Sequence, residues 1–175
     1  IGKNIKKYYI NNKDRIGFQW IHDSIGTNAR LTEIQSYAGY YQLKKLNFYI
    51  KKRNENANFL KKELSKINFF TFLNYSTNYY NSYYRFNFLF NPKYKTNKIS
   101  RDILLKELGS SINIREGSCP EIYKEKFFKT NFSFFCPNAK YIGKNSLSLQ
   151  VDHPIKKENL IKTVKTLKNF INKNY

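Results

Sequence analysis

Two polar side chains placed just ahead of a predicted helix are the strongest chemical signal in this sequence. Asn28 and Arg30 lie in a predicted loop, and the helix begins at Thr32. A loop that enters a helix N-terminus can direct polar side chains and free backbone N–H groups toward an anion, and phosphate is the natural ligand. On these residues alone two interpretations stay open: an anion site, or a turn asparagine beside a solvated arginine.

The other reactive residues form no recognisable catalytic or metal-binding pattern. Cys119 has histidines only far away in the sequence, and both of these, His22 and His153, are predicted in a loop or a turn. Cys119 and Cys136 do not form a Cys-x-x-Cys pair, and no histidine stands at metal-ligand spacing. The glycines are isolated, so no glycine-rich phosphate loop is predicted. We therefore assign no catalytic residue and no metal site here, and we expect two free thiols.

The formal net charge of +20 raises nucleic acid as a possible partner, because lysines can contact phosphates and aromatic rings can stack on bases. The distribution of the charge argues against this reading. Lysine supplies most of it and is spread from Lys3 to Lys173. Arginine, the bidentate phosphate binder, occurs only at positions 15, 30, 53, 85, 101 and 115. We expect no nucleic-acid partner, and a basic polyanion- or RNA-binding module remains an alternative.

The sequence predicts neither a membrane span nor a secretory signal. The apolar runs, such as Phe86 to Phe90, are far shorter than the ~20 residues that a spanning helix needs. The chain contains no Met and opens on Ile1. We interpret it as the later part of a longer cytoplasmic polypeptide with no membrane partner.

The first element that would position Asn28 and Arg30 is one long helix. Apolar residues recur at spacings of three and four from Leu31 to Ile50, which predicts one buried stripe. Thr32 and Gln35 have the spacing of a capping box at the start of this helix. We expect the helix to reach about residue 66, with a bend near Asn54.

Short strands and further helices follow. Strands are predicted over 69–73, 83–90, 112–115 and 146–151. One helix is expected from Ser100 to a stop at Gly109, and a final helix carries apolar residues from Leu160 to Ile171. The segment 116–137 is interpreted as a loop with a helical turn around 121–127, and residues 1–30 as loop and short helix. This order indicates an α+β fold, in which helices pack on a small, mainly antiparallel sheet behind a long N-terminal helix.

The region from Phe18 to Leu46 resembles the motif G-x-N-x-R-x-[ST]-[DE]-x-Q-A-A-x-G-x-x-Q-L-x-x-L of DegT-type sugar-nucleotide aminotransferases. Ser36-Tyr37 departs from the usual Ala-Ala. Further on, Arg53-Asn-Glu-Asn-Ala57 is similar to the R-x-x-x-A of the family's long helix. The chain's later segments Cys136-Pro-Asn-Ala139 and Ser146-Leu-Ser-Leu resemble the family's ending, although Gln150-Val-Asp-His intrudes before Pro154.

The resemblance implies the C-terminal part of a fold type I aminotransferase, which acts as a homodimer with pyridoxal 5'-phosphate. Residues 1–30 would end the large cofactor domain, and residues 31–175 would form the small domain with its long linking helix. The cofactor would be bound mainly by the missing N-terminal part. Asn28 and Arg30 would contact the cofactor phosphate or substrate carboxylate of the neighbouring subunit. Ser118, Glu121 and Tyr123 are the implied contacts for the sugar nucleotide.

The activity implied by the resemblance is transfer of an amino group from glutamate to a nucleotide-linked keto sugar, for cell-surface polysaccharide biosynthesis. Because the catalytic Lys would precede Ile1, we expect the chain to be inactive alone. A non-catalytic relative with the same fold is a second alternative, beside the polyanion-binding module.

Overall fold

The central sheet is built on a strand in which buried and half-buried residues alternate. The computed structural model describes residues 2–3, 18, 22–24, 26, 30–74, 78–129 and 135–175. Within them, β4 (Phe86–Phe90) buries its three phenylalanines on one face and pairs antiparallel with β6 (Ser146–Leu149). β3 (Phe70–Thr71) and β5 (Arg115–Glu116) complete a four-stranded antiparallel sheet in the order β3-β4-β6-β5.

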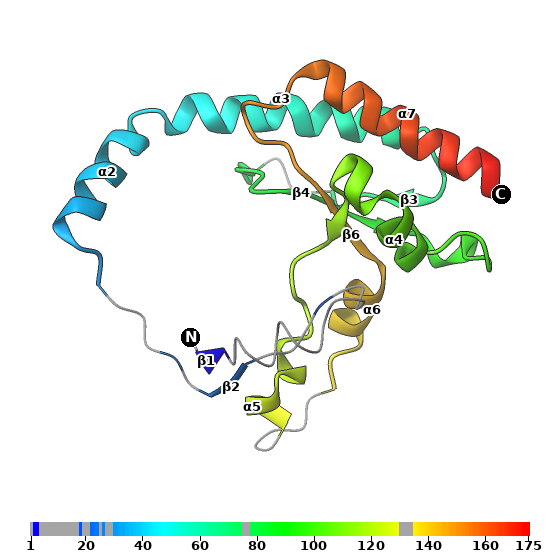
Figure 1. The fold of residues 1–175 in the computed structure, drawn as a ribbon, viewed down its shortest axis with the longest axis horizontal. Helices are drawn as coiled ribbons and strands as arrows, with labels where there is room; N and C mark the ends of the chain where they lie inside the picture. Colours follow the sequence, from blue (N-terminus) through cyan, green and yellow to red (C-terminus); the bar gives the residue numbers. More distant parts are fainter. Residues whose placement is uncertain are drawn as a thin grey trace.

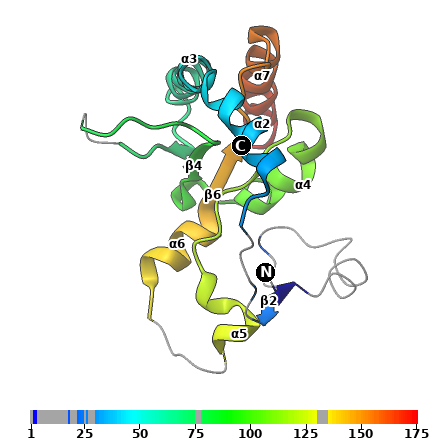
Figure 2. The ribbon, with the colours of Figure 1, turned by 90° about the vertical axis from the view of Figure 1, so that its left-hand side faces the viewer.

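Three helices supply most of the core that covers the phenylalanine face. They are α3 (Leu46–Leu64), α4 (Arg101–Ile112) and α7 (Lys157–Asn174). α3 and α7 lie against each other on one side of the sheet, and both views place α5 (Lys126–Lys129) and α6 (Pro137–Asn145) on the other side (Figures 1 and 2). Leu60 and Leu64 meet Leu160 and Leu167 in one buried cluster, where apolar burial stabilises the fold. The predicted α+β class is confirmed.

The single long helix is the main error in the sequence prediction. The structure divides it into α2 (Glu33–Leu43) and α3, with a turn at Lys44 and Lys45. The helix is not interrupted at Asn54, which lies inside α3. The side-chain amide of Asn54 donates to the carbonyls of Ile50 and Asn81, both at 2.9 Å, and so connects α3 to the segment before β4. Packing rather than propensity stabilises most protein helices. Of the two helices α2 and α3, only α3 packs on the core.

The predicted buried stripe is also wrong over the first helix. α2 has no buried residue, and Ile34 is 83% exposed. In Figure 1 this helix extends away from the sheet. Its start was predicted correctly, because Thr32 and Gln35 form a complete capping box.

Several other boundaries differ from the prediction. Each strand is shorter than expected, and α4 continues through Gly109 to Ile112, so the third strand begins only at Arg115. The helix stops at Asn113, whose φ of 51° is left-handed, a conformation that asparagine tolerates better than most residues. Helix α6 was not predicted, and the turn expected around 121–127 is a 3-10 turn, η2 (Ile122–Lys124), followed by α5.

The loop after β6 is attached to α3 by two polar side chains. Arg53 donates from Nη2 to Asp152 Oδ1 at 3.0 Å, and the Asn56 amide donates to the carbonyls of Val151 and Asp152. These contacts give Arg53, a residue of the second motif, a structural role. They also hold the segment Gln150–His153 that departs from the aminotransferase pattern.

Near the chain start, β1 (Gly2–Lys3) and β2 (His22–Ser24) form a separate antiparallel pair, and β2 lies close to α5. Strands here replace part of the predicted loop and short helix. Among the helices that the structure describes, none is long and apolar enough to cross a membrane.

Candidate functional site

Arg30 lies exposed immediately before the capped N-terminus of α2. No hydrogen bond or ion pair of its guanidinium is found among the described residues, whereas Asn28 lies outside them. The capping box occupies the backbone N–H groups of Thr32 and Gln35, so part of the donor set of this helix end is already used. An anion at this position would therefore be bound mainly through side chains, Arg30 first among them. The cofactor role of Asn28 and Arg30 stays a prediction.

The predicted substrate residues fall into two places. Glu121 and Tyr123 lie together at η2, where Tyr123 Oη donates to Glu121 Oε1 at 2.8 Å, and Lys124 Nζ forms an ion pair with the same oxygen at 2.8 Å. The Glu121 side chain is buried, with the residue only 4% exposed, and it borders a cavity of about 640 Å³ that also includes Cys136. Ser118 is exposed and lines a different cavity. Glu121 thus positions its neighbours, and its contact with substrate stays a prediction.

Two glycines allow close packing around the segment 117–121. In the sequence both are isolated and form no glycine-rich motif. A Cβ on Gly143 would lie 2.6 Å from Glu121 Oε2, so the carboxylate rests directly against the backbone of α6. A Cβ on Gly117 would lie 2.6 Å from the Cβ of Ser146 in β6. Both positions need glycine because side chains cannot occupy that space. The sequence shows that glycine occupies both positions, but only the packing explains why a larger residue does not fit there.

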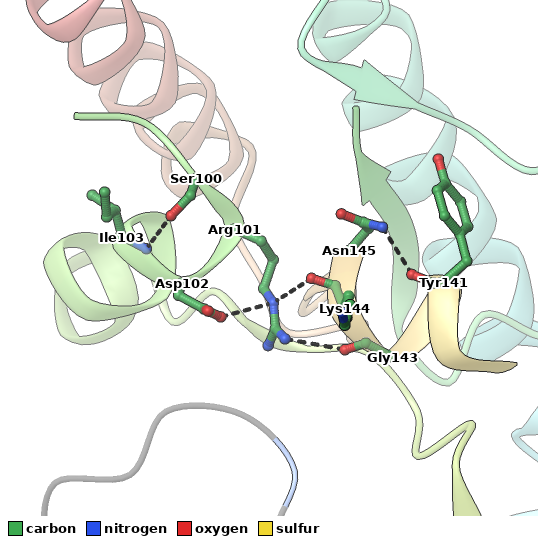
Figure 3. Close-up of polar contacts among 8 residues, drawn as sticks. All are labelled: Ser100, Arg101, Asp102, Ile103, Tyr141, Gly143, Lys144 and Asn145. Carbon is green, nitrogen blue, oxygen red and sulfur yellow. Dashed lines mark hydrogen bonds and ion pairs between the residues drawn. The ribbon is translucent and has the colours of Figure 1, made fainter. Parts of the chain in front are cut away.

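The C-terminal end of α6 is attached to the start of α4 by one arginine. Arg101 donates from Nε to the carbonyl of Lys144 and from Nη2 to the carbonyl of Gly143, both at 3.0 Å (Figure 3). Asp102 pairs with Arg101 Nε at 3.0 Å, and Ser100 caps α4 by accepting from the N–H of Ile103. Arg101 therefore holds the helix against which Glu121 rests.

Replacing Arg101 with alanine should lower the free energy of unfolding by about 2–3 kcal/mol, because two carbonyls at the end of α6 lose a charged donor. Urea denaturation measures this loss. Arg101→Lys should recover less than half of it, because an ammonium cannot reproduce the planar fork. Arg30→Ala, at an exposed arginine, is the matched control with an expected change below about 0.5 kcal/mol. An Arg101→Ala protein as stable as this control would refute the anchoring role.

The hydrogen bond between Tyr123 and Glu121 changes the acidity of the phenol. Accepting this bond, the Glu121 carboxylate raises the pKa of Tyr123 to about 12, with smaller contributions from desolvation and from the carboxylate charge. The phenol therefore stays protonated, and remains a hydrogen-bond donor, throughout the physiological range. Because the folded-state pKa is raised, the contribution of this bond is present at neutral pH and is lost as the pH rises through about 12.

Glu121→Gln should return the pKa of Tyr123 toward its ordinary value of 10. The measurement is a pH titration of tyrosine Cζ signals by NMR on protein with ¹³C-labelled tyrosine, in which Tyr123→Phe identifies the signal. An unchanged titration midpoint in Glu121→Gln would show that another group raises the pKa.

A second cavity, of about 600 Å³, contains two arginines that the motif did not mark. Arg85 and Arg115 line it together with Tyr84, Asn113 and Ser118, among others. We call this cavity the arginine groove. Tyr84 and Arg85 immediately precede β4, Arg115 lies in β5, and Ser118 lies in the loop after β5, so only the folded sheet brings them together.

The two cysteines are free thiols, as expected. Burial is the main cause that raises the pKa of the Cys119 thiol, and nearby Glu125 and Glu121 add to the effect. The raised pKa lowers the fraction of Cys119 that is thiolate at neutral pH.

The fold is that of solved aminotransferases. The aminotransferase from Psychrobacter cryohalolentis superposes with a TM-score of 0.75 at 25% identity, over 99% of this chain and 47% of that one. Helicobacter pylori PseC, an aminotransferase involved in the biosynthesis of pseudoaminic acid, gives 0.70 at 24% identity, over 85% of this chain and 40% of that one. A GDP-4-keto-6-deoxymannose-3-dehydratase with a trapped PLP-glutamate geminal diamine gives 0.66 at 23% identity, over 83% and 38%.

The sequence identifies the family to which the chain belongs. The model of the DegT/DnrJ/EryC1/StrS aminotransferase family matches residues 5–168, and the chain belongs to this family. The chain spans less than half the length of the solved relatives it resembles. A search of curated proteins gave no significant match.

Proposed function

We propose that this chain is part of a pyridoxal-phosphate-dependent aminotransferase that converts a nucleotide-linked keto sugar to an amino sugar, with glutamate as the amino donor. The observation that carries the proposal is the family match over residues 5–168. The solved relatives support the substrate class, since one is an aminotransferase involved in the biosynthesis of pseudoaminic acid and another is a GDP-4-keto-6-deoxymannose-3-dehydratase. The destination of the product is cell-surface polysaccharide.

The described residues fit a supporting role toward the cofactor. When bound, pyridoxal phosphate supplies the electron sink for amino transfer. Arg30 offers an exposed guanidinium, which suits bidentate contact with a phosphate or a carboxylate from outside the chain. Together with Asn28 it would hold an anionic group at the start of α2. The catalytic Lys belongs to the remainder of the enzyme, so the chain is not catalytic alone.

Helix α2 supports the proposed homodimer. Leu31, Ile34, Tyr37 and Leu43 are all exposed on this helix or at its start. Contiguous exposed apolar surface marks a contact with another protein surface. Packing of α2 against a second subunit would bury these residues and bring Arg30 to the neighbouring active site. The cytoplasmic location stays a prediction.

The function is tested on the complete enzyme, loaded with pyridoxal phosphate. With glutamate alone we expect about one equivalent of 2-oxoglutarate per active site, and continued release once a nucleotide-linked keto sugar is added. The isolated chain of 175 residues is the control and should release none. Failure of the complete enzyme to release 2-oxoglutarate would refute the proposal and favour a non-catalytic relative.

A further inference from the structure

The sheet register places Arg85 and Arg115 on one face. Arg115 pairs across the strands with Ser148, and Ser148 pairs on its other side with Asn87. Arg85 precedes Asn87 by two residues, and side chains two apart point to the same face of extended chain. Accordingly, Arg85 Nη1 donates to Ser148 Oγ at 3.3 Å. Arg85 and Arg115 therefore lie on the same face of the sheet as the buried Ser148. The Arg85 guanidinium contacts the serine hydroxyl, and Arg115 lies opposite the serine in the neighbouring strand.

Polar contacts orient both arginines before any ligand arrives. Ser148 donates its hydroxyl to the carbonyl of Glu116 at 2.9 Å, which leaves its oxygen as an acceptor for Arg85. Arg115 donates from Nε to Asn113 Oδ1 at 2.9 Å. Ordered side chains lose less conformational entropy when they bind, and this favours recognition.

Neither of these arginines has a carboxylate partner in the part of the chain that the structure describes. By contrast, Arg53 and Arg101 are ion-paired with Asp152 and Asp102. Glu116 is the acidic residue among those lining the arginine groove, so positive side chains outnumber negative ones there. This excess of positive charge favours an anionic ligand.

The size of the arginine groove and its neutral groups narrow the choice of anion. About 600 Å³ is enough space for a ligand of nucleotide size. Two planar guanidinium forks match two adjacent phosphates, and Ser118 and Gln150 add neutral hydrogen-bonding groups. At the rim, the exposed ring of Tyr84 can stack on a base or a sugar.

We propose that the arginine groove binds the diphosphate of a nucleotide, with Arg85 and Arg115 each contacting one phosphate. This inference rests on the proposed function, because it assigns the groove to the nucleotide end of the sugar substrate. Arg85, held by Ser148, fixes the position of the diphosphate. Arg115, at the exposed end, adds affinity.

The test is calorimetric titration of UDP and of inorganic pyrophosphate into the complete enzyme and its variants, with no amino donor present. Arg115→Gln should weaken UDP binding about ten- to hundredfold, because this is the usual loss of affinity when one hydrogen bond to a charged group is removed. Arg85→Lys should weaken it by at least about threefold, since the ammonium cannot hold both Ser148 and a phosphate. Lys93→Gln, an equal change of charge on the 3-10 turn η1 (Pro92–Tyr94), should leave binding unchanged.

Equal UDP affinity in Arg115→Gln and the unaltered chain would overturn the proposal. So would tighter binding of a single-stranded oligonucleotide than of UDP, with the same loss in Arg115→Gln, because the groove would then serve a polynucleotide backbone. If UDP binds no more tightly than inorganic pyrophosphate, the nucleoside makes no contact in the groove. The groove would then bind only a free diphosphate, and the assignment to a nucleotide would be wrong. Because the titration needs neither cofactor nor turnover, it can fail while amino transfer succeeds, and the reverse also holds.

Discussion

Replacing Phe88 with alanine is expected to lower the free energy of unfolding by about 3–5 kcal/mol, the range for removing a buried phenyl ring. Phe88 is fully buried at the centre of β4 and contacts the rings of Phe70, Phe72 and Phe86 at centroid distances of 5.1 to 6.0 Å. A typical domain has about 5–15 kcal/mol of stability in all, so this loss is a large part of it.

Urea denaturation followed by circular dichroism measures the effect of Phe88→Ala. Phe135→Ala is the matched control, because Phe135 is 92% exposed and its removal should cost less than about 0.5 kcal/mol. Phe88→Leu should fall between the two, since leucine refills part of the cavity. If Phe88→Ala and Phe135→Ala unfold at the same urea concentration, β4 is not the centre of the core.

Loss of Arg30 is expected to weaken binding of pyridoxal phosphate to the complete enzyme by about ten- to hundredfold, with little effect on stability. The reason is that a charge-assisted hydrogen bond contributes about 1.5–3 kcal/mol, and each 1.4 kcal/mol is a factor of ten. Arg30 is exposed and has no partner among the described residues, so its removal breaks no contact that stabilises the described fold.

Equilibrium titration of pyridoxal phosphate into Arg30→Ala, together with its steady-state turnover, measures this effect. Lys45→Ala is the control, because Lys45 is an exposed cation at the turn between α2 and α3. Arg30→Lys should recover part of the affinity, since it keeps the charge but loses the fork. Unchanged cofactor affinity and turnover in Arg30→Ala would contradict the role assigned to this residue.

Features that depend on neighbours in the sequence could be predicted without the structure. The capping box of Thr32 and Gln35 is a matter of local spacing, and both of its hydrogen bonds are present. The alternation in Phe86–Phe90 and the order of the elements were enough for the α+β class. The resemblance of the first motif led to the family that the sequence match confirms.

Features that depend on distant partners could not be predicted. The apolar spacing of α2 is the same whether its face packs on its own chain or on another protein, so the sequence could not show that Ile34 is exposed. Helix α6 begins at a proline without a side-chain cap and is held by Arg101 from another helix. The arginine groove joins residues that lie far apart in the sequence and meet only through the register of β4, β6 and β5.

The three predicted substrate residues also illustrate this difference between local and long-range features. Ser118, Glu121 and Tyr123 come from one short segment, and a sequence motif presents them as one group. In the fold, the burial of Glu121 against Gly143 turns two of them toward α6, while Ser118 faces the arginine groove. Contact of Ser118 with the nucleotide sugar follows only if the arginine groove binds the diphosphate as proposed, and it stays a prediction.

The central claim is that the complete enzyme moves an amino group from glutamate to a nucleotide-linked keto sugar. The most direct measurement supplies ¹⁵N-glutamate and a nucleotide-linked keto sugar to the complete enzyme loaded with pyridoxal phosphate, and follows the sugar nucleotide by mass spectrometry. We predict a nucleotide-linked amino sugar that carries ¹⁵N. Recovery of the keto sugar without ¹⁵N, while the cofactor stays bound, would contradict the claim.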